Sequence, residues 1–187
     1  MEKVDFRVQV SRKVLQDSLL ALMKEKSILH ISIKEICEFA GLSRSTFYAY
    51  YKDEYDLLQA IEEQTLIEAN AIALKYKMTA GKPNSQEITV ILQDILQLIV
   101  NNSNSIQVLW SENGDSDFQK KFFRKGIERM SQFRESVGTK SRDKEADKYD
   151  FAFVIGGMFT IVQEWLKNGM DIPAPKLAKI LAKYMGG

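Results

Sequence analysis

The chain has 187 residues, and 45% of them are hydrophobic, which suffices for a core in one domain or two small ones. The net charge of +1 does not by itself indicate a nucleic-acid partner, so the placement of the basic residues has to decide that question. No apolar run is long enough to span a membrane, and the N-terminus lacks the apolar region of a signal peptide. With one cysteine and three prolines, we expect an all-helical, cytoplasmic protein with no membrane partner.

The N-terminal region predicts an arm followed by a helix. Residues 1–10 are expected to be extended or frayed, with Arg7 able to reach a partner. Ser11 is expected to cap a helix over residues 11–26, because Leu15, Leu19 and Met23 recur on one side of it.

Residues 32–41 predict a short second helix with strong end signals. Ser32 and Glu35 have the spacing of a capping box, in which each side chain satisfies a backbone N–H of the other residue. Gly41 follows directly, as a helix end prefers, because glycine enters the left-handed region without a steric penalty. Ser43 then caps a third helix that begins at Arg44. Two helices joined by a short turn that contains glycine indicate a helix-turn-helix.

The third helix has one apolar side and one polar side. Phe47 and Tyr51 lie four residues apart and are expected to face inward. The outer surface then carries donors, hydroxyls and flat rings, which suit phosphate oxygens and base edges. Its side chains are those of Arg44, Ser45, Thr46, Tyr48, Tyr50 and Lys52. The alternative is a helical hairpin whose polar side is simply solvated. Residues 1–58 carry nine basic and nine acidic side chains, so we expect a moderate DNA binder.

The stretch from Ser32 to Leu58, with AGLSRSTFYAYYKDEYDLL at its centre, resembles the DNA-binding segment of the tetracycline-repressor (TetR/AcrR) family of bacterial regulators. The resemblance covers about the first third of the chain. It implies that Arg12 and Lys13 lie near the DNA backbone, that Tyr50 replaces a histidine that often touches the backbone, and that Glu54 replaces a common lysine. The residues assigned to DNA binding are Lys34, Ser43, Arg44, Ser45, Thr46, Tyr48, Tyr50 and Lys52.

The fourth helix, predicted over residues 54–76 with Asp53 as its cap, is long enough to leave the DNA-binding head. Residues 79–86 form a break that contains Gly81 and Pro83. We place the domain boundary inside this helix. The expected domains are a helix-turn-helix DNA-binding domain at 1–58 and a helical ligand-binding and dimerisation domain at 59–187.

The second half of the chain predicts five further helices, for about nine in total, at residues 87–100, 105–110, 118–136, 148–168 and from about 174 onward. Residues 118–136 have a basic outer face, which we interpret as a solvated surface. Residues 138–147 are expected to form a mobile charged loop. Helix 148–168 is apolar nearly all round, so we expect it to be buried in a core or in a subunit interface. The expected dimer contacts are Ala152, Gly156, Thr160, Ile180 and Tyr184.

The sequence shows no motif typical of a catalytic or metal-binding site. His30 is the only histidine, and no histidine or cysteine cluster has metal-ligand spacing. A Ser-His-acid set would need that isolated loop residue, and there is no phosphate-binding glycine loop. The adjacent carboxylates Glu62 and Glu63 fit a solvated helix surface. We therefore expect neither an enzyme nor a cofactor.

The sequence therefore predicts a homodimeric transcriptional regulator, most simply a repressor, that binds operator double-stranded DNA under the control of a small-molecule effector. Side chains that could line an effector pocket are Trp110, Phe122, Met130, Met158 and Phe159, although core packing explains them equally well. The alternative is a DNA-bound regulator whose helical body docks a partner protein. An open pocket favours the first, and an exposed apolar patch favours the second.

Overall fold

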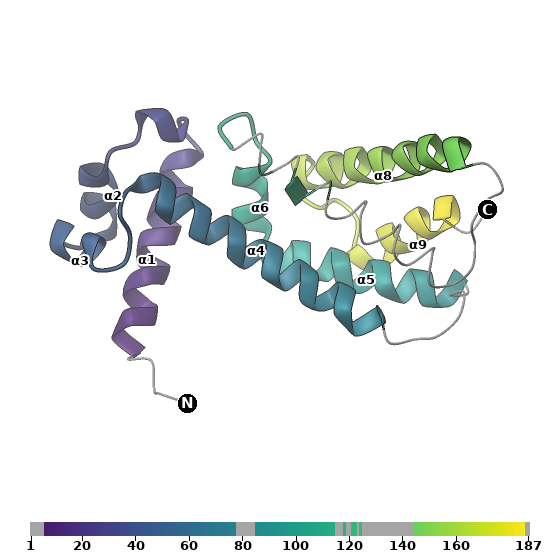
Figure 1. Cartoon of the computed structure of the whole chain (residues 1–187), viewed down its shortest axis with the longest axis horizontal. Coiled ribbons are helices and arrows are strands. Elements are labelled where there is room, and N and C mark those ends of the chain that lie inside the picture. The colour runs from purple at the N-terminus through teal and green to yellow at the C-terminus, as the bar shows by residue number, and fades with distance from the viewer. Residues whose placement is uncertain are drawn as a thin grey trace. The chain divides into compact units, whose positions relative to one another are not determined.

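The computed structural model describes residues 6–77, 85–114, 118, 121, 122, 124 and 144–185, and within these ranges it is all-helical. The helices of the head and the long helix that follows are α1 (Phe6–Met23), the 3-10 turn η1 (Ile28–His30), α2 (Ile33–Ala40), α3 (Arg44–Tyr48) and α4 (Glu54–Lys77) (Figure 1). The later helices are α5 (Ser85–Asn101), α6 (Ser103–Leu109), α8 (Lys144–Lys167) and α9 (Ala174–Met185).

The chain divides into two compact units. The first comprises Met1–Thr65 together with Asn104–Ser116, and the second comprises Leu66–Ser103 together with Asp117–Gly187. The division falls within α4, so this helix contributes residues to both units. Most of α6 belongs to the first unit, although it follows α5 of the second.

The first unit is built around a small core. Its fully buried side chains come from α1, α2, α3, α4 and α6 and include Leu15, Ile36, Phe47, Leu57 and Ile106. The α1 helix packs against α2, and α2 against α3. Burying apolar area of this kind stabilises α2 and α3, which have 8 and 5 residues and are too short to be stable alone.

The start of α1 differs from the expectation. The helix begins at Phe6, so residues 6–10 are helical and not an arm, and it ends at Met23. Ser11 lies inside the helix and does not begin it. No proline or glycine between Phe6 and Ser11 interrupts the helix. A serine caps a helix only where its own backbone and that of the preceding residues are not helical, and here those residues are helical.

The second unit places α5 against α9, and α9 against α8. Leu96 of α5 and Leu181 of α9 are almost completely buried. The end of α8 is fixed by Trp165, whose Nε1 donates to the Ile172 carbonyl over 2.8 Å. Gly169, at φ 71°, ends that helix, as expected.

Two polar contacts join the second half of α4 to α5. Lys75 Nζ lies 2.6 Å from Asp94 Oδ2. Asn102, which directly follows α5, donates from Nδ2 to Glu68 Oε2 over 2.8 Å. These contacts make the end of α4 part of the packing of the second unit.

The α8 helix begins at Lys144, four residues earlier than expected, because Lys144, Glu145 and Ala146 favour a helix and extend it into the expected loop. Residues 138–143 of that loop lie outside the described residues. Of the helix expected at 118–136, Phe118, Lys121, Phe122 and Arg124 are described and helical. Phe118 is fully buried, with its ring centroid 6.0 Å from that of Phe122.

Within the part of the chain that the structure describes, none of the helices combines the length and the apolar character that crossing a bilayer requires.

Candidate nucleic-acid interface

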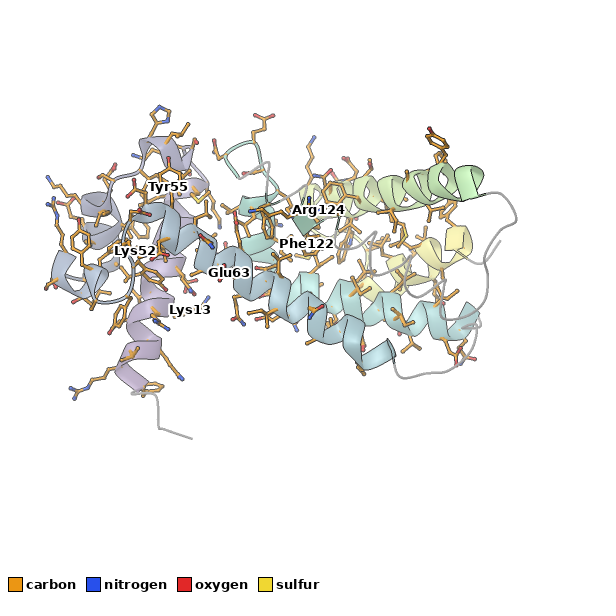
Figure 2. All side chains as sticks on the ribbon, in the orientation of Figure 1. Lys13, Lys52, Tyr55, Glu63, Phe122 and Arg124 are labelled. Atoms are coloured by element: carbon orange, nitrogen blue, oxygen red, sulfur yellow. The ribbon has the colours of Figure 1, made fainter. Side chains whose placement is uncertain are left out.

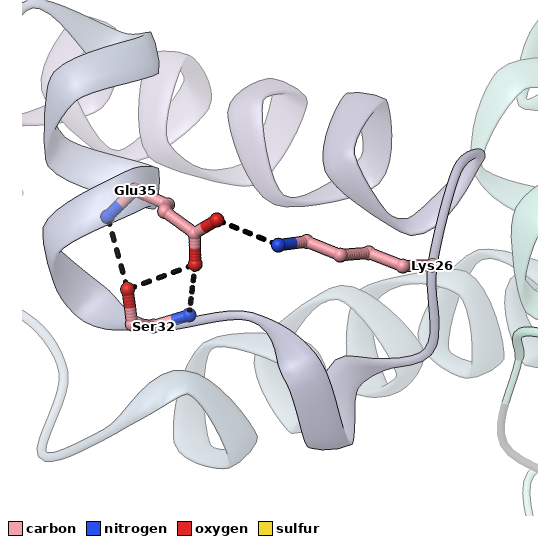
Figure 3. Close-up of polar contacts among 3 residues, drawn as sticks. All are labelled: Lys26, Ser32 and Glu35. Carbon is pink, nitrogen blue, oxygen red and sulfur yellow. Dashed lines mark hydrogen bonds and ion pairs between the residues drawn. The ribbon is translucent and has the colours of Figure 1, made fainter.

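The start of α2 is held by the expected capping box, which Figure 3 shows. Ser32 N–H donates to Glu35 Oε2 over 3.0 Å, and Glu35 N–H donates to Ser32 Oγ over 3.3 Å. A further partner comes from Lys26, whose Nζ donates to Glu35 Oε1 over 2.6 Å. This bond, together with those from Ser32, lowers the pKa of Glu35 to about 2. One carboxylate therefore fixes α2 to the loop before it.

The turn between α2 and α3 is a tight left-handed corner. Gly41 has φ 65° and ψ 26°, and its N–H donates to the Glu38 carbonyl. Leu42 N–H donates to the Cys37 carbonyl over 3.0 Å, so two of the last carbonyls of α2 are satisfied. Ser43 then begins α3, accepting from Thr46 N–H at Oγ over 3.1 Å. The predicted helix-turn-helix is confirmed in its geometry.

Phe47 of α3 and Tyr51 both face inward as expected, although α3 ends at Tyr48 and Tyr51 lies in the turn that follows it. Phe47 is fully buried and Tyr51 almost so. Their ring centroids lie 5.9 Å apart. Tyr48 stays 58% exposed while its ring contacts that of Phe47 edge to face. The buried pair thus fixes α3 on the head and leaves its other side to solvent.

The outer surface of α3 carries a hydroxyl cluster and an exposed cation. Ser43 Oγ lies 2.7 Å from Ser45 Oγ and 2.9 Å from Thr46 Oγ1. Arg44 and Ser45 are exposed, and Thr46 is half-buried. Guanidinium and hydroxyl groups of this kind donate to phosphate oxygens and to base acceptors in the major groove.

Lys34 and Lys52, the two lysines assigned to DNA, are both exposed. Lys34 Nζ lies 3.7 Å from Glu38 Oε1, so its charge is partly balanced. Lys52 lies in the turn between α3 and α4 (Figure 2). Its backbone N–H donates to Asp56 Oδ2, and Asp56 N–H donates to Asp53 Oδ1 over 2.8 Å. Asp53 therefore acts as the expected cap of α4.

Tyr50 is half-buried and has a partner that sequence reasoning did not identify. The guanidinium carbon of Arg12 lies 5.5 Å from the centroid of the Tyr50 ring. One turn along α1, Gln16 Nε2 donates to the Tyr51 hydroxyl over 3.4 Å. The sequence does not indicate that Arg12 and Tyr50, 38 positions apart, are neighbours. It indicates only that Arg12 and Gln16, four residues apart, lie on one side of α1.

The residues proposed to line an effector pocket are divided between the two units. Trp110 belongs to the first unit, whereas Phe122, Met158 and Phe159 belong to the second, and all four are half-buried. Met130 lies outside the described residues. Across the described ranges, no three histidine, cysteine or carboxylate side chains gather as a metal site would require. Cys37 is buried on α2, and this burial raises the pKa of its thiol.

The residues predicted for a dimer contact lie on α8 and α9, and none of them is fully buried in the single chain. Ala152, Thr160 and Tyr184 are exposed, and Gly156 and Ile180 are half-buried. Phe153, on the same part of α8, is 83% exposed. Of the two expectations for this helix, burial in the core of one chain is therefore not met, and burial in a subunit interface stays a prediction.

Comparison with known proteins agrees with this architecture. Residues 86–187, more than half of the chain, match a TetR C-terminal family described as "Transcriptional regulator C-terminal region". A 49-residue segment is 41% identical to an uncharacterized HTH-type transcriptional regulator, YxbF, of Bacillus subtilis, and spans 26% of this chain but only 13% of that protein.

Two solved structures share the fold at low sequence identity. The fatty acid degradation regulator FadR from Bacillus halodurans is 12% identical, with a TM-score of 0.70 over 100% of this chain and 97% of its own. The TetR-like transcriptional regulator LfrR from Mycobacterium smegmatis, solved in complex with proflavine, is 19% identical, with a TM-score of 0.55 over 95% and 96% of the two chains.

Proposed function

Because the chain belongs to the TetR family of transcriptional regulators, we propose that it is a homodimeric repressor that binds operator DNA through α3 and releases it under the control of a small-molecule effector. The observation that carries the DNA-binding part is the geometry of α3. A buried Phe47 fixes the helix, while Arg44, Ser45 and Tyr48 project from it. A helix held in this way fits the major groove.

Dimerisation is proposed on two grounds. A five-residue helix contacts too few base pairs to select one operator, so two heads reading a two-fold-related site are needed. The exposed apolar side of α8, which contains Phe153, also supports a two-fold contact, because monomers rarely expose such a surface.

Effector control is proposed to act through α4. In the first unit, Leu57, Leu58 and Ile61 of this helix are buried. In the second unit, its distal half is joined to α5 by the Lys75–Asp94 ion pair. A ligand that prefers one position of this helix shifts the spacing of the two heads and thereby the affinity for DNA. A tenfold to hundredfold effect requires a coupling of about 1.4–2.8 kcal/mol. The proflavine complex of LfrR supports a small molecule as the effector.

The alternative, in which the helical body docks a partner protein, is favoured by the same exposed side of α8. The two accounts differ in a measurement. Calorimetry measures the affinity of the protein for a candidate effector with and without operator DNA. If the small-molecule account is right, operator DNA weakens effector binding by the same factor by which the effector weakens operator binding. Equal affinities rule out this lever for that ligand.

The DNA-binding claim is tested by recovering fragments of genomic DNA on the purified full-length chain and sequencing them. The proposal predicts that the wild type enriches a small set of fragments and that Tyr48→Ala or Arg44→Ala loses the enrichment. Recovery of the same fragments by all three proteins would show that α3 does not read the sequence.

A further inference from the structure

Arg12 differs in its surroundings from the three lysines of the head that form ion pairs. In residues 6–65, the ammonium groups of Lys13, Lys26 and Lys34 each lie within 4 Å of a carboxylate. Arg12 forms no ion pair within the described residues, and its guanidinium instead lies over the Tyr50 ring. A carboxylate partner would cancel much of its charge, whereas an aromatic face attracts the cation and leaves the charge intact.

The ring beneath Arg12 is firmly held. Tyr50 is half-buried, and its centroid lies 6.5 Å from that of Tyr51 in an edge contact. Tyr51 is fixed in turn by the Phe47 ring at 5.9 Å and by the hydrogen bond from Gln16. Gln16 is one turn beyond Arg12 on the same side of α1, so the helix that carries the cation also holds Tyr51, the ring against which the Tyr50 ring lies.

This arrangement places Arg12 beside the candidate interface. Tyr50 stands two residues after Tyr48 and two before Lys52 along the chain. A guanidinium that lies over a ring still presents N–H donors to solvent, and these donors match the two oxygens of a phosphate. The contact with the ring also restricts the side chain, so less conformational freedom is lost when a phosphate is bound.

We propose that Tyr50 is a positioning residue of the DNA interface. It holds the guanidinium of Arg12, which the family resemblance already places near the DNA backbone, for a phosphate contact, and it does not act through a DNA contact of its own hydroxyl. The inference rests on the proposed DNA-binding function. It revises the expectation that Tyr50 itself contacts DNA.

The test uses the full-length chain and a short random-sequence DNA duplex, with affinity measured by fluorescence anisotropy between about 50 and 200 mM salt. Arg12→Gln lowers the slope of log affinity against log salt by about 0.9 per protomer, the value for one lost phosphate contact. The matched control is Lys24→Gln, which removes the same charge from an exposed position 12 residues further along the N-terminal stretch. This control leaves the slope unchanged.

Tyr50 variants separate positioning from direct contact. Tyr50→Phe keeps the ring and retains wild-type binding, whereas Tyr50→Leu reduces the slope as Arg12→Gln does. The double variant Arg12→Gln/Tyr50→Leu lowers the salt slope no further than Arg12→Gln alone, because both substitutions remove the same phosphate contact. Circular dichroism checks that each variant is folded. If Tyr50→Leu does not fold, the exposed Arg12→Gln and the conservative Tyr50→Phe still decide the question.

An unchanged slope for Arg12→Gln would overturn this inference while leaving the proposed function standing. Equal losses in Tyr50→Phe and Tyr50→Leu would also overturn it, because they would assign the contact to the hydroxyl. A wild-type chain that does not bind the duplex even at low salt would contradict the proposed function itself, and the inference with it.

Discussion

Lys26 Nζ lies 2.6 Å from Glu35 Oε1, so a residue just after α1 holds the carboxylate that caps α2. The same carboxylate accepts from the Ser32 N–H and hydroxyl. The start of the helix-turn-helix is therefore fixed by an ionised group whose pKa is about 2 in the folded protein. The stability of the head should depend on the charge of this group.

The first prediction concerns pH. Because the pKa of Glu35 is depressed on folding, its contribution to stability is fully present above the unfolded pKa of about 4.3 and is lost as pH falls toward 2. Glu35→Gln, which can keep the cap, should lower the melting temperature at pH 7, and its difference from wild type should shrink between about pH 4.3 and 2. Thermal melts by circular dichroism across this range measure the effect.

Lys26→Met serves as the partner variant, since it removes only the ion pair. Lys26→Met should also weaken the pH dependence of the melting temperature. The double variant should lower the melting temperature by less than the sum of the two single variants. A constant difference between Glu35→Gln and wild type from pH 7 to pH 2 would contradict the role given to the charge.

The second prediction concerns the corner between α2 and α3. A Cβ on Gly41 meets no atom within 4 Å, yet φ is 65°. Gly41→Ala should therefore lower the free energy of unfolding by about 1–2 kcal/mol through backbone strain alone. The control is Gly157→Ala in α8, where a Cβ also meets nothing within 4 Å. There alanine should stabilise the helix by about 1 kcal/mol. Urea unfolding that showed the same sign for both would reject this account.

The third prediction concerns DNA contacts from α3 and the turn after it. Tyr48→Ala and Arg44→Ala should each cost about 1–3 kcal/mol of affinity for the operator and much less for random DNA. Lys52→Ala should weaken binding to both and reduce the salt slope by about one unit. Titrations on specific and random duplexes distinguish these patterns, and three variants with wild-type affinities would show that the surface faces away from DNA.

The fourth prediction concerns the acidic start of α4. Glu54 is half-buried close to Lys52 and occupies a position where the resembled family often has lysine. Glu54→Lys should strengthen DNA binding, and the gain should be largest at low salt, where charge interactions are least screened. Glu63→Lys changes the charge by the same amount nine residues further along α4 (Figure 2). This variant should change the affinity for DNA less than Glu54→Lys does. Equal gains would indicate only a general charge effect.

The fifth prediction concerns assembly. Gly156→Leu places a large side chain on the exposed side of α8, where a Cβ meets nothing within 4 Å in the single chain. If that side forms the dimer contact, the variant should sediment as a monomer or become insoluble, whereas Glu63→Leu should remain dimeric. A wild-type chain that sediments as a monomer at micromolar concentration would contradict the dimer.

The local signals of the head were readable from sequence because each has a short-range physical cause. Ser32 and Glu35 satisfy backbone groups three residues apart, and Gly41 occupies a conformation that few other residues adopt. The burial of Phe47 and Tyr51 also agrees with the prediction, although Tyr51 lies beyond the end of α3. Such features depend on neighbours in the chain, so they can be predicted without knowing the fold.

The contacts between distant segments could not be predicted in the same way. Arg12 meets Tyr50, and α6 joins the first unit, only because the chain folds back on itself. The beginning of α1 also differs from the prediction, because Ser11 has the character of a cap but residues 6–10 before it are already helical. The proposed pocket remains a prediction because its members were chosen by residue type and not by position.

The central claim is that two copies of α3 read a two-fold-related operator, and a DNase footprint on a fragment recovered from genomic DNA tests it most directly. The account predicts two protected half-sites whose centres are separated by one helical turn, about 34–36 Å, or a multiple of it. It also predicts that Arg44→Ala loses this protection at a concentration where wild type is saturated. Uniform protection along the fragment, or an Arg44→Ala footprint identical to that of wild type, would contradict the account.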